Sequence, residues 1–124
     1  ETITKVRNNY RLLNFKGVSE DILILARHVN VYLNEKAPWK LIKNKDGLDE
    51  VAEIIYEALE TSRIIGVLLM PILPNISQKI LNQLSFNDKI TVWDDYLEWG
   101  LLKPGLSLPT PEPVLPKIEI PEDL

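Results

Sequence analysis

The sequence predicts an all-α fold, a helical bundle followed by an extended, proline-rich C-terminal tail. Apolar residues recur at spacings of three and four between residues 22 and 84, which is the period of amphipathic helices. Six prolines fall between residues 104 and 124, where helical periodicity is absent. With 124 residues and 45% hydrophobic residues, the chain can bury one core without crosslinks. We expect the bundle over residues 1–100 and the extended segment over residues 101–124.

The first two predicted helices meet at a turn near residue 14. Residues 1–12 have weak periodicity and are expected to form the end of a helix that begins upstream. Asn14 is a candidate N-cap for the next helix, and Ser19 offers a second start. In that helix one face is apolar, and it consists of Ile22, Leu25, Ala26, Val29 and Leu33.

Pro38 marks a corner in the chain. It disfavours helical geometry at Ala37 and has no amide hydrogen, so the helix should stop near Glu35. Proline also suits the first position of a helix. The segment PWKLIK is therefore predicted to be a sharp corner and a short helical turn, followed by a loop over residues 43–47.

The longest predicted helix begins near Asp49 and is the central helix of the bundle. Its expected core stripe is Val51, Ile54, Ile55, Ala58, Leu59, Ser62 and Ile65. The residues expected to face water are Glu53, Glu57, Glu60 and Arg63. Pro71 should kink or end this helix, and a last helix should run from Pro74 to about residue 84. Beyond it, we expect Trp93, Tyr96 and Trp99 to act as isolated anchors, and the tail to pack along the bundle or lead to another domain.

Composition excludes several classes of function. The chain has no cysteine, which excludes disulfides, thiolate metal sites and cysteine nucleophiles. Its formal charge of −4 argues against a protein that coats phosphate backbones. The apolar run from Ile64 to Leu73 is far shorter than the roughly 20 residues of a membrane-spanning helix, so no membrane contact is expected.

No residue is assigned to catalysis, to a cofactor or to a metal. The single histidine, His28, flanks the apolar stripe of its helix and is predicted to be a packed or interface residue. Glycine-rich phosphate loops and the serine elbow of hydrolases are absent. Asp94, Asp95 and Glu98 resemble a cation cluster, but a solvated charged edge explains them better because no further ligand accompanies them.

Trp39 is the residue that core packing explains least well. It follows Pro38 at the corner, and Lys36, Lys40, Lys43 and Lys45 are close in sequence. An aromatic plane beside cations suits an unpaired nucleic-acid base, held by stacking and by phosphate contacts. Alternatively, Trp39 folds back to cap the bundle, with its indole N–H bonded to a carbonyl.

Three separated motifs carry a family resemblance. The run ARHVNVYLNEKAPWKLIK at 26–43 resembles the helix-to-corner signature of the anticodon-binding domain of methionyl-tRNA synthetases. MPILPNISQKILNQL at 70–84 and WGLLKPGLSLPTPEPVLPKIE at 99–119 resemble later signatures in the same order. The resemblance implies an all-helical bundle that follows a catalytic domain and binds the anticodon loop of methionine tRNA, in the bacterial cytoplasm or an organelle matrix.

Carried over residue by residue, the resemblance makes Trp39 the platform for the wobble cytosine and Pro38 the residue that fixes its direction. Asn30 matches the family's VN position and would support the corner or meet the RNA. Lys36, Lys40 and Lys43 would hold phosphates beside Trp39. The family's HIGH and KMSKS motifs, which bind ATP and activate methionine, are absent here, so ATP is expected only in a catalytic domain of the parent protein.

The family's first helix, whose asparagine and arginine help to read the anticodon, also has no counterpart here. We therefore expect exposed apolar surface and self-association of the truncated bundle. The competing interpretation is a helical protein-interaction adaptor that uses Trp39 or the proline-rich tail as its anchor.

Overall fold

A computed structural model describes residues 1–105 and 107–114, and in this part of the chain the fold is all-α. The helices are α1 (Thr2–Arg11), α2 (Phe15–Lys36), α3 (Pro38–Leu41), α4 (Leu48–Leu69) and α5 (Pro74–Gln83), with short 3₁₀ turns η1 (Lys45–Gly47) and η2 (Trp93–Tyr96). The expected all-α bundle is confirmed. The predicted course of residues 115–124 lies outside the described residues.

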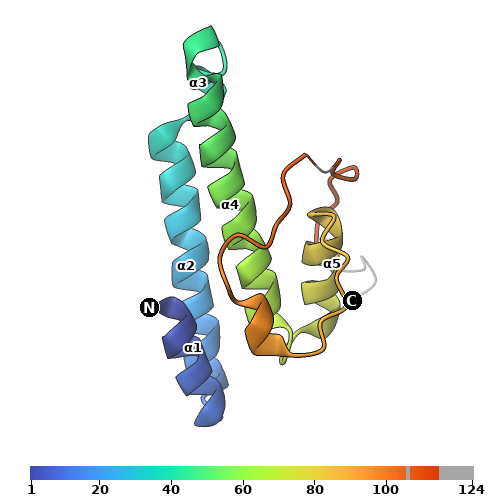
Figure 1. Ribbon diagram of the computed structural model, residues 1–124. Helices are drawn as coiled ribbons and strands as arrows, with labels where there is room; N and C mark the ends of the chain where they lie inside the picture. The colour runs from blue at the N-terminus through green and yellow to red at the C-terminus, as the bar shows by residue number, and fades with distance from the viewer. Residues whose placement is uncertain (106, 115–124) are drawn as a thin grey trace, which may run out of the picture.

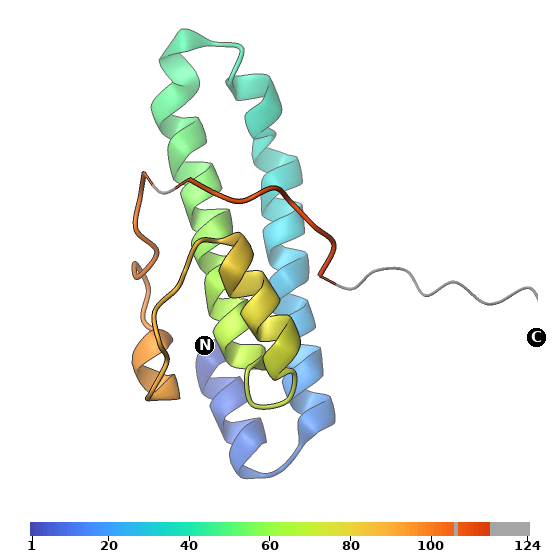
Figure 2. The same cartoon turned by 90° about the vertical axis from the view of Figure 1, so that its right-hand side faces the viewer.

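The two longest helices, α2 and α4, form an antiparallel hairpin (Figure 1). Both have 22 residues, so α4 is not longer than α2. Figures 1 and 2 show α1, α5 and η2 beside the lower half of this hairpin, whereas α3 stands alone at its upper end. We call this upper end, residues 37–48, the tip.

Local signals set the helix boundaries as predicted. The Asn14 side chain caps α2, because its Oδ1 accepts a hydrogen bond from the Gly17 amide at 3.1 Å. Pro38 occupies the first turn of α3, and α5 begins at Pro74. Helix α4 ends at Leu69, just before Pro71.

The core lies in the lower half of the hairpin. Its buried members come from α1, α2, α4, α5 and the segment after α5, and they are Val6, Val18, Ile22, Ile64, Val67, Leu68, Leu81, Leu84, Phe86, Leu97 and Leu102. Helix α5 approaches α4 closely at Gly66, where a Cβ would lie 3.1 Å from Ile80 Cγ2. The Trp93 indole N–H donates to the Val67 carbonyl at 2.6 Å, so Trp93 is an anchor as expected.

Glu60 and Arg63 were predicted to face water, and this prediction is wrong. Both side chains are fully buried, and the Arg63 guanidinium donates to both carboxylate oxygens of Glu60, at 2.8 and 3.0 Å. The segment between Tyr96 and Leu102 crosses α4 at this point (Figure 1), and its backbone supplies the remaining partners of the pair. We call this segment the strap.

The opposite error occurs at Ile55, which was expected in the core and is 43% exposed. Ile55 lines an open pocket of about 310 Å³ together with Leu84 and Leu102. The side chain is therefore only partly covered. Val51, Ile54 and Ala58, from the same predicted stripe, are buried.

The tail contacts the bundle through its backbone. Gln83 Nε2 donates to the Glu112 carbonyl at 2.6 Å, and Ser85 Oγ donates to the Ser107 carbonyl at 2.7 Å. The described residues 107–114 contain no helix, as expected of this proline-rich stretch.

Candidate nucleic-acid interface

The corner at the tip is a reversal made by one residue in the left-handed conformation. Ala37 has φ 45° and ψ 62°, and its amide donates to the Leu33 carbonyl at 2.9 Å, which closes the last turn of α2. The left-handed region costs an L-residue about 1 to 2 kcal/mol. Pro38 follows with its ring buried, so the direction of α3 is fixed both by the proline torsion and by packing.

Backbone hydrogen bonds close the rest of the tip. The Ile42 amide donates to the Pro38 carbonyl at 2.9 Å, and the Asn44 amide donates to the Leu41 carbonyl at 3.0 Å. Turn η1 then folds back on α3, since a Cβ on Gly47 would lie 2.9 Å from the Leu41 carbonyl oxygen. A larger residue at Gly47 would therefore push this turn away. The tip is a preorganised structure rather than an open loop.

Trp39 is presented to solvent at this tip. It is 53% exposed, although the preceding Pro38 is buried. Among the described residues its indole N–H has no hydrogen-bond acceptor, in contrast to the half-buried indole of Trp93. This geometry speaks against Trp39 as a bundle cap and leaves about half of a large aromatic side chain accessible for stacking.

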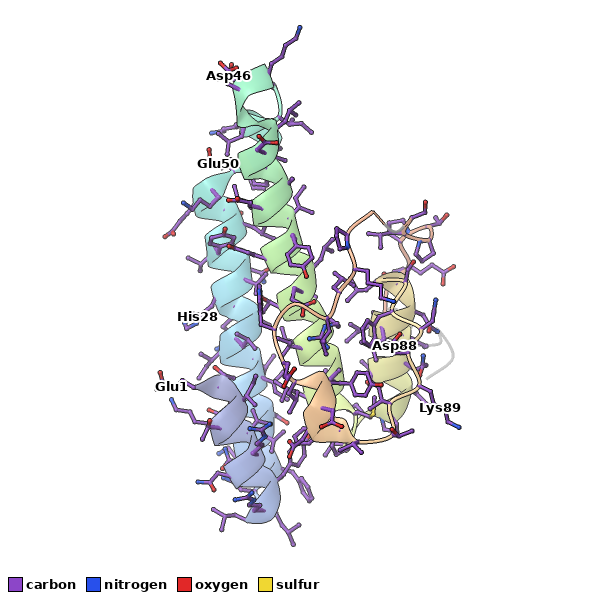
Figure 3. All side chains as sticks on the ribbon, in the orientation of Figure 1. Glu1, His28, Asp46, Glu50, Asp88 and Lys89 are labelled. Atoms are coloured by element: carbon purple, nitrogen blue, oxygen red, sulfur yellow. The ribbon has the colours of Figure 1, made fainter. Side chains whose placement is uncertain are left out.

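The charge around Trp39 is locally positive. Lys36, Lys40, Lys43 and Lys45 are all exposed, and residues 36–45 contain no acidic residue. The ion pairs of the described residues involve none of these lysines. Acidic residues follow immediately, and Figure 3 shows Asp46 at the end of the tip and Glu50 just below it. Asp49 and Glu50 lie in the first turn of α4, where they complement the helix dipole.

The structure brings Pro38, Trp39 and the lysines together, and it places Asn30 further away. Asn30 is exposed on α2, and six residues, or about 9 Å of helix, separate it from Lys36. Among the described residues the Asn30 side chain makes no hydrogen bond to the corner. The role of Asn30 therefore stays a prediction.

Sequence reasoning missed two apolar side chains at the tip. Ile42 is 56% exposed and Leu48 is 52% exposed, so the apolar surface around Trp39 is wider than one ring. The available signal was the spacing of three residues between Trp39 and Ile42, which places both on one side of α3.

The other polar groups considered do not form a second centre. His28 is exposed at the rim of a shallow pocket of about 220 Å³ between α2 and α4, so it is not packed. In the same pocket the Tyr32 hydroxyl donates to Glu57, and this hydrogen bond raises the pKa of Tyr32 to about 12. Asp94 accepts a hydrogen bond from Arg7 Nε at 2.8 Å.

The described part of the chain has neither a cluster of metal-ligating side chains nor a helix of membrane-spanning character. Across residues 1–105 and 107–114, no three acidic or histidine side chains gather where they could hold a metal ion. Within the same residues, no helix is long and apolar enough to cross a membrane.

Comparison with known proteins identifies the family of this chain. Residues 2–123 match the family model described as the anticodon binding domain of methionyl tRNA ligase. A methionine–tRNA ligase of Synechocystis sp. is 35% identical over 96% of this chain and 24% of the relative. One of Thermosynechococcus vestitus is 38% identical over 90% of the chain and 22% of the relative.

The chain matches a small part of each of these relatives, and a plant relative is among them. A chloroplastic/mitochondrial methionine–tRNA ligase of Arabidopsis thaliana is 32% identical over 95% of the chain and 20% of the relative. The chain thus spans about a fifth of the length of the curated relatives it matches. Because the family model covers nearly every residue and the relatives agree, the chain belongs to the family of methionyl-tRNA ligase anticodon-binding domains.

Proposed function

We propose that this chain recognises the anticodon of methionine tRNA as part of a methionine–tRNA ligase. One observation carries the proposal, namely the half-exposed Trp39 on the buried Pro38 at the lysine-rich tip. Trp39 stacks on an unpaired anticodon base, and Lys36, Lys40 and Lys43 hold the neighbouring phosphates. Activation of methionine with ATP belongs to a catalytic domain of the parent ligase, which is the intramolecular partner of this domain.

Physical chemistry supports an unpaired base as the ligand. The tip is convex and narrow, so it suits a loop whose bases are splayed out better than the groove of a duplex. Stacking of one base on an aromatic side chain contributes about 1 to 3 kcal/mol. Selection of one base over another requires hydrogen bonds to the edge of that base. Asn30, on the preceding helix, is the proposed polar residue nearby, and we assign it no particular contact with the RNA.

The test compares two tryptophans of matched exposure. Trp39 is 53% exposed at the tip and Trp99 is 56% exposed on the strap. In the full-length ligase, Trp39→Ala should weaken binding of a methionine anticodon stem-loop by roughly 5- to 150-fold, the equivalent of one lost stack. Trp99→Ala should leave binding unchanged. Equal effects of the two substitutions would refute the proposal.

A second RNA tests selectivity. A stem-loop whose first anticodon base is changed should bind wild-type protein more weakly than the methionine stem-loop. Trp39→Ala should reduce the difference between the two RNAs. Equal affinity of wild-type protein for both RNAs would exclude anticodon reading at this tip.

Salt dependence separates RNA binding from the protein-interaction adaptor, which the family match does not favour. Each phosphate contact on single-stranded RNA contributes a slope of about −0.7 in log affinity against log salt. Contacts from the four lysines at and beside the tip, Lys36, Lys40, Lys43 and Lys45, would therefore give a slope of about −3 at most. An adaptor that binds through apolar contacts should show a slope near zero.

A further inference from the structure

The side chain of Ile42 is exposed, although its backbone is hydrogen-bonded like the rest of the tip. Its amide donates to the Pro38 carbonyl at 2.9 Å, and it closes α3 in helical geometry with φ −62° and ψ −20°. Even so, its side chain is 56% exposed. Core packing therefore does not explain an isoleucine at this position.

The spacing of Ile42 from Trp39 matches one nucleotide step. Residues three apart on a helix lie on one side, and they differ by about 4.5 Å along the axis. Successive nucleotides of a stacked strand are about 3.4 Å apart. When one base stacks on Trp39, the adjacent nucleotide of the strand is therefore within reach of Ile42. A nucleotide two steps away is too far.

Two lysines have the same spacing as Trp39 and Ile42, and each directly follows one of these two residues in the sequence. Lys40 and Lys43 are also three residues apart and both are exposed. The backbone continues this turn with a bond from the Lys43 amide to the Lys40 carbonyl at 3.4 Å, and side chains three apart are nearly in line in such a turn. An apolar row, Trp39 and Ile42, thus runs beside a cationic row, Lys40 and Lys43. The two rows match the two parts of a nucleotide, because the base can pack on the apolar row and the negative phosphate can pair with the cationic row.

We propose that the tip is a platform for two nucleotides, in which Ile42 packs against the nucleotide adjacent to the base on Trp39. This inference rests on the proposed function and names a further binding residue of the same site. Contact with an aliphatic side chain uses the flat face of a base, which every base possesses. Ile42 therefore contributes affinity without selecting the base, and selection stays with the nucleotide on Trp39.

The first experiment measures RNA binding by the full-length ligase carrying Ile42→Ser. Loss of one apolar contact should weaken binding of the methionine stem-loop by about 3- to 10-fold. Ile42→Leu, which keeps the apolar surface, should restore most of the affinity. Leu23→Ser is the matched control, because Leu23 is 52% exposed on α2 and far from the tip, and it should have no effect.

The second experiment locates the contact on the RNA. Stem-loops are prepared with an abasic nucleotide on either side of the first anticodon base. With one of these RNAs, wild-type protein and Ile42→Ser should bind equally, because the partner of Ile42 is gone. An undiminished effect of Ile42→Ser with both abasic RNAs overturns the proposal.

The outcomes also separate this inference from the proposed function. If Trp39→Ala weakens binding and Ile42→Ser does not, the two-nucleotide platform is wrong and anticodon recognition stands. If neither substitution weakens binding, the proposed function fails as well. If Ile42→Ser weakens only the binding of a protein partner, the surface is a protein contact and the proposal is overturned.

Discussion

The buried pair of Glu60 and Arg63 gives the sharpest stability prediction. Arg63 donates four hydrogen bonds, two to Glu60 and one each to the Tyr96 and Glu98 carbonyls at 2.7 Å. Its guanidinium also lies 5.3 Å from the centre of the Phe86 ring. Arg63→Met would leave two strap carbonyls without this donor and a buried carboxylate without its counter-charge.

The structure sets the size of this effect. Removing one partner of a buried ion pair costs about 3 to 5 kcal/mol. Glu60 would keep three backbone donors, the amides of Gly100, Leu101 and Leu102 at 2.8 to 3.1 Å, which should hold the cost near the lower end of that range. A loss of about 3 kcal/mol is a large part of the roughly 5 to 15 kcal/mol that stabilises a typical domain.

Urea unfolding, followed by circular dichroism and by tryptophan fluorescence, measures the change. The control is Arg7→Met, because Arg7 pairs with Asp94 at 2.8 Å on the exposed surface and such pairs contribute at most about 1 kcal/mol. The double variant Glu60→Gln/Arg63→Met removes both charges and should be more stable than Arg63→Met alone. A loss with Arg63→Met no larger than with Arg7→Met would refute the reasoning.

Three further predictions concern the cap of α2, the tyrosines and the exposed face of α2. Asn14→Ala should lower the free energy of unfolding by about 1 kcal/mol through loss of the cap, whereas Asn44→Ala, at a position without a side-chain cap bond, should change little in the same urea assay. Burial raises the pKa of Tyr10 from 10.0 to about 12, so the folded state holds this proton more tightly than the unfolded state. The stabilisation is complete below pH 10 and is lost as the pH rises towards 12; unfolding measured from pH 9 to 12 should show this fall, and Tyr10→Phe should make it shallower. Ile24 and Val31 are exposed on α2, so the 124-residue chain should self-associate and Ile24→Ser/Val31→Ser should reduce this in light scattering; a strictly monomeric wild-type chain would contradict the prediction.

Features with local causes could be predicted from the sequence. The cap at Asn14, the corner at Pro38 and the restart at Pro74 each depend on the backbone chemistry of one residue. Such a residue acts on its immediate neighbours, so no knowledge of the tertiary fold is needed. The family resemblance added the order of these elements.

The position of the strap could not be predicted in this way. Glu60 and Arg63 were expected on the solvent-exposed face of α4 because they are charged. They precede the buried Val67 by seven and four residues, however, and therefore lie on the core-facing stripe of the helix. Their partners come from the backbone more than 30 residues further along the chain. Periodicity shows which face a residue occupies, but it does not show that a distant segment covers that face.

Of the candidate site, Trp39 could be predicted from the sequence and Ile42 could not. Trp39 stands out because it follows a proline and is surrounded by lysines, and both signals are local. Ile42 was not singled out because isoleucine is a common core residue, and only the fold shows that α3 projects beyond the core. Exposure of an apolar residue depends on which neighbours are absent, and a sequence pattern does not contain that information.

The buried core and the proposed recognition surface occupy opposite ends of the α2–α4 hairpin. The buried core cluster lies in the lower half, and Pro38 is the one buried residue of the tip. Val51, Ile54 and Ala58 are the buried apolar residues of α4 between the two. Between the two ends, the Tyr32 hydroxyl bridges α2 to Glu57 on α4. Substitutions at Trp39 or Ile42 therefore remove little buried surface and should change RNA affinity with little effect on unfolding. Substitutions in the strap should do the reverse, because the hydrogen bonds that close the tip do not involve the strap.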